Sequence, residues 1–451
     1  MKLNPKIRVI GAGLAGTEAA VQAANMGVSV ELYEMKPKKY TPAHHTAGFA
    51  ELVCSNSFRS SQLSNAVGVL KKELSMLNSL FMEAAYKTEV PAGCALAVDR
   101  ERFSAYITDK IRSHPLITVV EEEVVSIPSD GINVIATGPL TADGLAGEIS
   151  SLLGGEQLHF FDAAAPIVDF ATVNTDIAFF ASRYGKGNGD DYLNCPMTRE
   201  QYDAFYEALT SAEEAPLKAF DSASQKELTV FEGCMPIEVM ARRGRDTLRF
   251  GPMKPVGLPL PQTGEDAYAT VQLRRENRDG TMYNIVGFQT HLTFAEQRRV
   301  FRMIPGLENA EFFRYGVMHR NTYINSPGLL SPDYSVKERP NLYFAGQMTG
   351  VEGYVESAAS GFVAGVSAAR RALGLDTLLF PRETVIGAMA CYVSEGPTHG
   401  SFQPMNANFG ILPQLDTKIK GGKKARNEAF AVRSEGVLAD FLNELKKGVQ
   451  G

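Results

Sequence analysis

The chain opens with short apolar runs on either side of a segment of small residues, a pattern typical of a strand, a helix and a second strand. Residues 7–10 read as the first strand, residues 17–26 as the helix and residues 28–33 as the second strand. Gly27 suits the position just after this helix, because glycine adopts a left-handed conformation without steric cost. The pattern therefore predicts a βαβ unit at the start of the chain.

The same alternation of helices and strands continues to about residue 169. An expected helix at residues 66–86 carries an apolar stripe of Leu70, Leu74 and Leu77, and Phe81 extends this stripe. A further helix is expected at residues 97–114, where Asp99 is the N-cap, and further strands are expected at 117–125 and 132–136. Beyond residue 169, helices are expected at 198–210 and 212–220, and strands at 228–232, 268–273 and 282–288.

The alternation is interrupted from about residue 170 and returns at residue 340, where a strand, a glycine turn and a helix rich in Ala and Gly follow one another. Residues 35–63 and 182–197 are expected to be mostly irregular. The expected fold class is α/β, a Rossmann-type dinucleotide-binding domain with an inserted α+β domain. Its expected parts are residues 1–169 and 331–415 for the dinucleotide-binding domain, 170–330 for the insertion and 416–451 for a polar, basic C-terminal segment.

Composition narrows the class of protein. The 451 residues are 44% hydrophobic and 21% charged, as in soluble globular proteins, and no run of 18 apolar residues predicts a membrane span. The first strand begins so early that a signal peptide is not expected. Five scattered cysteines without a CxxC pair predict neither disulfides nor a metal site and fit a reducing cytoplasm. The net charge of −6 argues against a general nucleic-acid or DNA binder, although a local basic surface remains compatible with it.

The turn after the first strand has the G-x-G-x-x-G spacing of a dinucleotide-binding site. One glycine allows the tight turn, one lets the backbone approach a pyrophosphate, and one lets the helix pack against the strand. Free N–H groups at the helix N-terminus then hold the phosphates, and an acid ending the second strand accepts the ribose hydroxyls. The residues are Gly11, Ala12, Gly13, Leu14, Ala15, Gly16 and Glu34. This fingerprint alone does not separate FAD from NAD.

A second glycine turn near the C-terminal end distinguishes the two cofactors. A chain that begins with the fingerprint and returns to F-A-G-Q-x-x-G before a helix can hold both ends of one long cofactor, FAD. The helix N-terminus would stabilise a reduced, anionic flavin. An apolar strand ending in A-T-G is common in flavoproteins with two dinucleotide folds. The expected cofactor-binding residues of these segments are Thr137, Gly138, Gly346, Gln347, Gly353 and Tyr354.

Four motifs extend this picture over nearly the whole chain. They are L-V-C-S-N-S-F-R at residues 52–59, F-E-G-C-M-P-I-E at 231–238, R-F-G-P-M-K-P-V-G-L at 249–258 and Y-F-A-G-Q-M-T-G-V-E-G-Y at 343–354. Together they resemble the bacterial folate- and FAD-dependent tRNA (uracil-5-)-methyltransferase family. The resemblance implies methylation of the T-loop uridine at tRNA position 54. It also implies that 5,10-methylenetetrahydrofolate supplies the carbon through reduced FAD, that tetrahydrofolate is released and that NADH or NADPH regenerates the reduced flavin.

The chemistry of uracil C5 explains why such an enzyme needs cysteines. C5 is a poor nucleophile until a thiolate adds at C6, and a second group must then remove the C5 proton. By resemblance, Cys54 and Cys234 are the two functional cysteines. We assign Cys234 as the C6 nucleophile and Cys54 as the proton-transfer partner, and the spacing leaves the reverse assignment open. Cys54 lies in a polar loop that should reach the ligand-binding edge of the sheet.

The remaining candidates are basic or aromatic residues of the insertion. A pocket for anionic, flat folate suggests Arg274, Arg275, Tyr283 and His291. Phosphate contacts to the T arm of tRNA are expected from basic side chains, which position RNA without reading its sequence. The expected RNA-binding residues are Arg242, Arg243, Arg245, Arg249 and Lys254, with a second cluster at Arg298, Arg299 and Arg302.

Two other functions compete with this interpretation. The first is that of the flavin-dependent tRNA wobble-uridine-modifying family, which shares the Rossmann ends but is a much longer chain with a helical C-terminal domain. The second is an NAD(P)H-dependent FAD oxidoreductase without an RNA substrate. The basic insertion and the two placed cysteines favour the methyltransferase.

Overall fold

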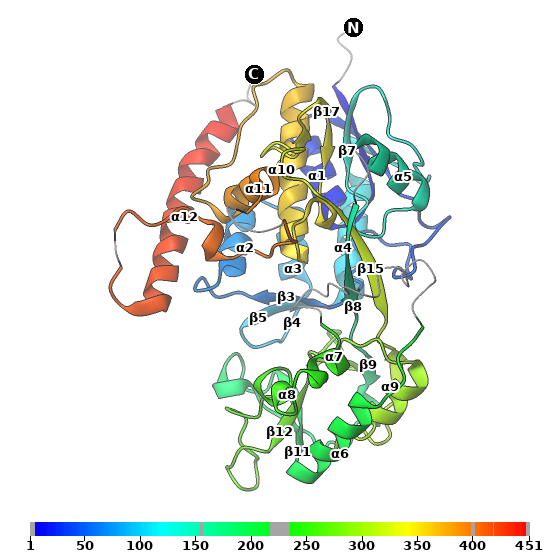
Figure 1. Cartoon of the computed structure of the whole chain (residues 1–451). Helices are drawn as coiled ribbons and strands as arrows, with labels where there is room; N and C mark the ends of the chain where they lie inside the picture. The colour runs from blue at the N-terminus through cyan, green and yellow to red at the C-terminus, as the bar shows by residue number, and fades with distance from the viewer. Residues whose placement is uncertain (1–4, 154–156, 217–234, 398–401, 418, 448–451) are drawn as a thin grey trace.

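The computed structural model describes residues 5–153, 157–216, 235–397, 402–417 and 419–447. Two sheets lie at opposite ends of the molecule, and a long two-stranded ribbon runs between them (Figure 1). The ribbon pairs β8 (Gln157–Ala163) with β15 (Met318–Ile324) in antiparallel register. The chain therefore enters and leaves the smaller lobe through adjacent strands.

The six-stranded sheet of the larger lobe has the parallel order expected of a Rossmann-type domain. Its strands, from one edge to the other, are β16 (Ser335–Val336), β17 (Arg339–Phe344), β7 (Ile132–Ile135), β1 (Lys6–Ile10), β2 (Ser29–Tyr33) and β6 (Ile117–Val120). All neighbouring pairs are parallel except β16 with β17. Strand β17, more than 200 residues after β7 in the chain, pairs directly with it. After the insertion the chain therefore returns to the first sheet, as the sequence predicts.

The helix that follows the first glycine turn packs unusually closely on a helix from the other end of the chain. These are α1 (Leu14–Asn25) and α10 (Tyr354–Ala372), which lie side by side in Figure 1. A Cβ added to Gly361 would lie 2.2 Å from the carbonyl oxygen of Ala15, and one added to Gly365 would lie 2.5 Å from that of Ala19. The small residues of α10 therefore permit backbone contact, as the sequence predicts.

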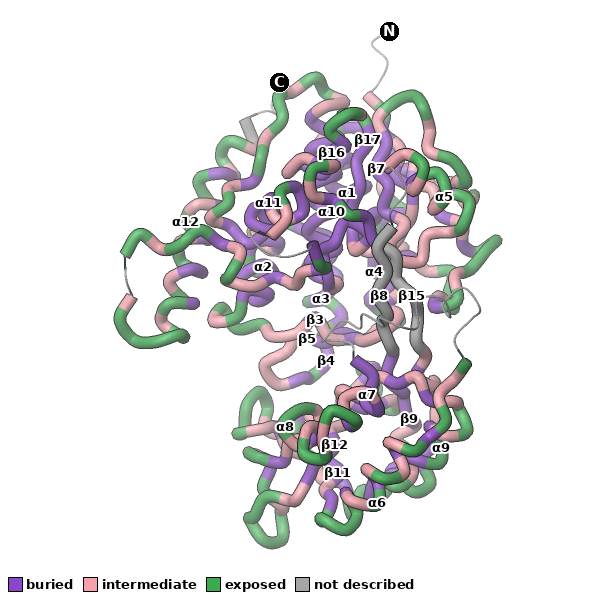
Figure 2. The backbone as a smooth tube through the Cα atoms, viewed as in Figure 1, coloured by how far each residue is buried: buried purple, intermediate pink, exposed green. Residues whose placement is uncertain are grey.

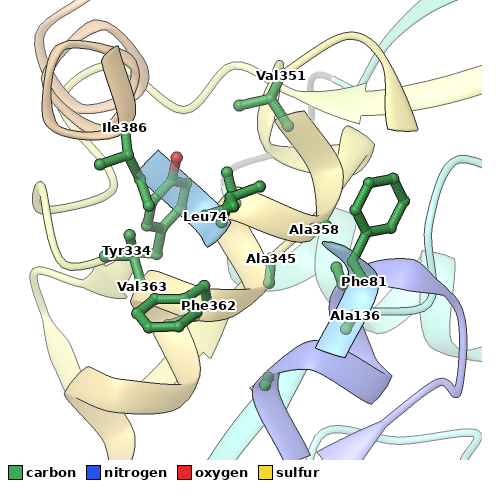
Figure 3. Packing of buried hydrophobic residues seen from close by; sticks show 14 of the residues in the cluster. Leu74, Phe81, Ala136, Tyr334, Ala345, Val351, Ala358, Phe362, Val363 and Ile386 are labelled. Carbon is green, nitrogen blue, oxygen red and sulfur yellow. The ribbon is translucent and has the colours of Figure 1, made fainter. Parts of the chain in front are cut away.

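The core of this lobe is continuous around α10, most of which is buried (Figure 2). Figure 3 shows Leu74, Tyr334, Phe362, Val363 and Ile386 meeting in one apolar cluster. The helices that supply and surround it are α2 (Ala66–Met76), α3 (Leu80–Lys87), α4 (Arg100–Ser113), α5 (Asp143–Leu152), α11 (Val385–Glu395) and α12 (Gly422–Lys447). Among the helices of the described residues, none is both long and apolar enough to cross a membrane.

The smaller lobe is built on an antiparallel sheet with a core of its own. Its strands in order are β10 (Phe179–Phe180), β11 (Tyr192–Met197), β12 (Ala269–Arg275), β13 (Met282–Ile285), β9 (Ile167–Asp169) and β14 (Phe312–Arg314). Its helices are α6 (Arg199–Thr210), α7 (Ile237–Arg242), α8 (Thr247–Phe250) and α9 (Phe294–Phe301). The α+β character agrees with the expected insertion, and the residue boundaries proposed for the domains stay a prediction.

Several expected elements differ in the structure. The single helix predicted at residues 66–86 is two helices, because Asn78 has a left-handed backbone (φ 57°) and Ser79 caps α3. The irregular segments contain β3 (Ser57–Ser60) and β11, and the strand predicted at residues 117–125 ends at Val120. Strand β3 pairs with β5 (Ala95–Val98), which also pairs with β4 (Glu89–Val90). The described part of the helix predicted at residues 212–220 is not helical, and residues 217–220 and the strand at 228–232 lie outside the described residues.

A buried glutamate of α2 joins this helix to α11 and α12 by hydrogen bonds. Glu73 of α2 accepts hydrogen bonds from the backbone N–H groups of Val385 (2.7 Å) and Ile386 (2.8 Å), at the N-terminus of α11. It also accepts one from the hydroxyl of Ser434 on α12. Burial raises the pKa of Glu73 from 4.5 to about 7. Phe430, Leu438 and Phe441 of α12 are buried nearby, so the C-terminal segment is a packed helix as well as a polar surface.

This pKa predicts the sign of one pH dependence. Between about pH 4.5 and 7 the folded state holds a proton on Glu73 that the unfolded state has lost, so this group lowers the free energy of unfolding as the pH rises. The slope is roughly 1.4 kcal/mol per pH unit at most. We expect Glu73→Gln to remove that decline in urea unfolding curves, while Glu101→Gln, an exposed control, keeps it. An unchanged slope in Glu73→Gln would contradict the linkage.

Candidate functional site

A cavity of about 520 Å³ lies at the carboxyl ends of the parallel strands. Ligands of open α/β sheets bind at this edge. The first glycine turn, the end of β2, the A-T-G segment after β7 and the second glycine turn after β17 all contribute to its wall. The sequence-predicted residues that line it are Gly11, Ala12, Gly13, Leu14, Ala15, Glu34, Cys54, Thr137, Gly138, Arg274, Gly346, Gln347, Gly353 and Tyr354.

The three glycines of the first turn have different surroundings, and each fits its predicted role. Gly11 has φ +100°, and a Cβ there would lie 2.6 Å from the carbonyl oxygen of Ala136. A Cβ on Gly16 would lie 1.8 Å from the carbonyl oxygen of Gly11, so this glycine permits the helix to pack on the turn. A Cβ on Gly13 would meet no protein atom within 4 Å and would project into the cavity. The turn therefore leaves open the space where a pyrophosphate would approach the backbone.

Glu34 closes this end of the cavity. Its carboxylate is buried and accepts hydrogen bonds from the backbone N–H groups of Ala12 (2.9 Å) and Lys36 (3.0 Å). A carboxylate has about four acceptor sites, so lone pairs remain for ribose hydroxyls. The structure thus gives Glu34 a second task that the sequence did not predict, which is to fix the glycine turn.

The second end of the cavity is formed by two further glycines with positive φ. Gly346 (φ +85°) donates its N–H to the Ser360 hydroxyl at 2.7 Å, and Gly353 (φ +116°) is the N-cap of α10. The amide of Gln347 donates to Glu352 at 2.6 Å. Helix α10 begins at Tyr354 and presents its N-terminus to the cavity, where its partial positive charge favours an anionic ligand. Together the two ends fit an elongated dinucleotide such as FAD.

Cys54 lies on the wall of the same cavity and contacts Tyr354. Its Sγ is 3.1 Å from the Tyr354 hydroxyl oxygen, and its backbone N–H donates to that oxygen at 2.9 Å. Cys234 lies outside the described residues. The described chain resumes at Met235, and Ile237 donates its N–H to the carbonyl oxygen of Gln289, which lines the cavity.

The sequence did not predict the residues that hold the Cys54 segment in place. Arg100 donates to the carbonyl of Leu52, and Arg314 donates to that of Val53. Arg274 donates to the hydroxyl of Ser55 and the side-chain oxygen of Asn56, both at 3.0 Å. These three arginines come from α4, β14 and β12, so both lobes bind one short segment. No motif marks Arg100 or Arg314, because their partners are backbone carbonyls far away in sequence.

The four folate candidates are dispersed. Arg274 lines the cavity, whereas Tyr283 is buried in the second core, where it stacks on Phe170 with ring centroids 5.1 Å apart. Burial lowers the pKa of His291, whose backbone N–H donates to Glu238. Arg275 lines a separate hollow of about 280 Å³ with Pro91, Phe180, Asn188, Asp190 and Asp191.

Several of the expected RNA-binding arginines have acidic partners. Arg242 pairs with Glu214 at 2.5 Å, Arg245 with Asp203 at 2.7 Å and Arg249 with Asp246 at 2.8 Å. Arg243 is exposed and Lys254 is half-buried. In the second cluster, Arg299 pairs with Glu296, Arg302 with Glu311, and Arg298 donates to the hydroxyl of Tyr315. Because of these ion pairs, the surface carries less net positive charge than the run of basic residues in the sequence suggests.

Comparisons with known proteins agree with the fold. The model of the glucose inhibited division protein A family matches residues 6–376. A methylenetetrahydrofolate–tRNA-(uracil-5-)-methyltransferase TrmFO of Enterococcus faecalis is 58% identical over 98% of this chain and 100% of its own length. The protein of the same name from Listeria monocytogenes is 57% identical over 98% and 100%. A solved structure of Aquifex aeolicus GidA superimposes with a TM-score of 0.69, at 19% identity, over 99% of this chain and 76% of that one.

Proposed function

The chain belongs to the methylenetetrahydrofolate–tRNA-(uracil-5-)-methyltransferase family, within the wider glucose inhibited division protein A family, and from this membership we propose how its residues act. It is an FAD-dependent enzyme that methylates uracil C5 in tRNA with carbon from 5,10-methylenetetrahydrofolate. The identity of its relatives over their full length favours this function over an oxidoreductase or a wobble-uridine-modifying enzyme. We further propose the T-arm uridine at position 54 as the target, NAD(P)H as the reductant and the cytoplasm as the location.

The observation that carries the proposal is the position of Cys54 on the wall of the dinucleotide cavity. When bound, reduced FAD would supply the one-carbon carrier and the hydride. Residues Gly11 to Gly16 and Glu34 would hold its adenosine half, and the N-terminus of α10 would face its flavin half. Cys234 would add to C6 of the uracil, and Cys54 would take the proton from C5. The target base has to leave its stack to reach this cavity.

The direct test is to locate the new methyl group. We would incubate unmodified tRNA with the enzyme, NADPH and methylenetetrahydrofolate labelled in its one-carbon unit, and then map nucleosides by mass spectrometry. Labelled 5-methyluridine in a T-arm fragment is the expected result. Label at a wobble uridine, or NADPH oxidation without label in RNA, would replace the proposed function by one of its two competitors.

The RNA surface is proposed on the insertion, at Arg242, Arg243, Arg245, Arg249 and Lys254. Charge reversal of Arg242 and Arg243 to glutamate should weaken tRNA binding by roughly tenfold or more and reduce its salt dependence, because phosphate contacts release counterions. NADPH oxidation by the bound flavin should be unchanged. Filter binding at several salt concentrations measures both quantities.

A matched control for this experiment is present in the other lobe. Lys38 and Lys39 are adjacent and exposed, so their double change to glutamate alters net charge by the same amount. This control should bind tRNA almost normally. If the two double variants lose affinity equally, the effect is one of overall charge, and the RNA does not contact Arg242 and Arg243.

A further inference from the structure

The hydrogen bonds of the Tyr354 hydroxyl determine the direction of its contact with Cys54. The oxygen accepts the backbone N–H of Cys54 at 2.9 Å and that of Ser55 at 3.3 Å. These two donors use both lone pairs of a hydroxyl oxygen. The remaining hydroxyl proton is directed at Sγ of Cys54, 3.1 Å away, so sulfur is the acceptor in this contact. A thiolate accepts such a hydrogen bond much better than a neutral thiol.

Tyr354 is suited to remain the donor. Burial, together with the neighbouring Cys54, raises its pKa well above 10, so the phenol keeps its proton at neutral pH. The hydroxyl is placed by the first turn of α10, one of the most buried helices of the molecule. This geometry is therefore rigid, and the partial positive charge of the helix N-terminus adds to it.

The charged side chains around the Cys54 segment also favour a thiolate. Arg274 is almost fully buried and donates to Ser55 and Asn56, and Arg314 donates to the carbonyl of Val53. In the described chain, the carboxylate paired within this group is Glu276, at 2.5 Å from Arg100. Three arginines against one carboxylate leave an excess of positive charge beside the sulfur, and cationic surroundings favour the thiolate form of cysteine.

We propose that Tyr354 and Arg274 are positioning residues that keep Cys54 as a thiolate in the resting enzyme, before any substrate binds. Tyr354 supplies the hydrogen bond to sulfur, and Arg274 supplies charge and fixes the loop from the insertion sheet. The catalytic use of this thiolate rests on the role proposed above for Cys54, which is to take the proton from C5. Its test needs no RNA, so the two can fail separately.

A stored thiolate matches the proton transfer assigned to Cys54. After C5 of the C6 adduct has bonded to the one-carbon unit, its C5–H bond breaks. The proton forms an S–H bond with Cys54, and the electron pair of the broken bond passes into the neighbouring ring carbonyl as an enolate. No further oxidant or reductant takes part in this step. A neutral thiol at this position would first have to lose a proton to solvent, from which the cavity wall partly shields it.

Any pH effect on Cys54 has to be read against all charged groups packed around its segment. On β3, Arg59 pairs with Glu356 of α10, and Lys71 of α2 donates to the carbonyls of Phe58 and Arg59. The other groups are Arg100, Arg274, Glu276, Arg314 and Tyr354. Lys36 and Glu51, which pair at 3.9 Å, line the same cavity. Burial lowers the pKa of Lys71 to about 7, so this lysine titrates near neutral pH and needs its own control.

The test is the pH profile of alkylation of Cys54 in the FAD-containing enzyme. Iodoacetamide labelling of each cysteine is measured by peptide mass spectrometry from about pH 5.5 to 9.5, with half-exposed Cys94 as the reference thiol in the same sample. We expect the Cys54 rate to be nearly constant above about pH 6.5, while the rate of free cysteine alkylated in parallel rises roughly tenfold per pH unit up to the midpoint of an ordinary thiol near 8.5.

Variants then separate the two positioning residues from a general loss of structure. Tyr354→Phe keeps the ring, and Arg274→Met removes charge; each should move the midpoint of the Cys54 profile upward by about one pH unit or more. Arg274→Lys should recover part of the shift. Tyr86→Phe and Arg382→Gln, changes of exposed residues, and Lys71→Met should leave the Cys54 midpoint unchanged.

Retained FAD colour shows that each variant is folded. Tyr354→Phe changes a single oxygen atom, so it tests the proposal even where Arg274→Met loses FAD. If Cys54 of the unaltered enzyme follows the same profile as free cysteine, or if Tyr354→Phe leaves the Cys54 midpoint in place, the proposal is wrong.

Discussion

Replacing Gly13 by valine is expected to give folded protein without FAD. A Cβ at this position meets no protein atom within 4 Å, so the fold can accept the side chain. The side chain would instead occupy the part of the cavity where the pyrophosphate has to approach the backbone N–H groups. The purified variant should be colourless, with a circular dichroism spectrum like that of the unaltered protein, and its methyl transfer should fall below detection.

The matched control is Gly147→Val. Gly147 lies on α5, and a Cβ there also has no atom within 4 Å, but this glycine does not line the cavity. The control should remain yellow, with one FAD released per chain on denaturation. Retention of FAD by Gly13→Val would show that the pyrophosphate binds elsewhere, and release of NAD without flavin from the unaltered protein would contradict the cofactor itself.

The sequence predicts the turns at the carboxyl ends of the parallel strands well, because short local motifs specify them. The turn glycines, Glu34 and the helix after Gly353 each stand in a short segment whose residue types and spacing mark the turn in the sequence. The break at Asn78 has a different origin. Ser79, Leu80 and Phe81 donate hydrogen bonds to Glu18, a buried residue of α1, so a distant carboxylate starts a new helix where the apolar stripe continues without interruption.

The same distinction applies to the site. The motif around Cys54 predicts a functional loop, and the motif around Tyr354 predicts a cofactor contact, but nothing in either indicates that the two side chains touch. Their contact joins residues 300 positions apart. Arg274 was considered for folate because it is basic, whereas in the structure it holds the Cys54 loop. Residues whose partners come from another lobe carry no local signal, and only the three-dimensional structure reveals them.

The two cysteines are expected to fail in different ways when RNA containing 5-fluorouridine is used as a trap. Without the C6 nucleophile, C5 is never activated and no covalent adduct of protein and RNA can form. Without the proton-transfer group, addition still occurs but the product cannot be released. Because the fluorine at C5 cannot leave as a proton, the unaltered enzyme should also be trapped, as a band of slower mobility on a denaturing gel.

We therefore expect Cys234→Ala to form no adduct, and Cys54→Ala to retain adduct formation while its turnover falls by roughly a thousandfold or more, the loss typical of removing a group that acts in the chemical step. Cys195→Ala, a change at a fully buried cysteine of the insertion sheet, is the control for a lost thiol and should methylate normally if it folds. All three variants should bind FAD and oxidise NADPH, since none of these residues lies in a glycine turn.

Adduct formation by Cys234→Ala but not by Cys54→Ala would exchange the two roles. The thiolate held by Tyr354 would then be the attacking sulfur, because a cysteine that is already ionised and faces the cavity is equally suited to add to C6. Normal methylation by both Cys54→Ala and Cys234→Ala would rule out a mechanism based on either thiol.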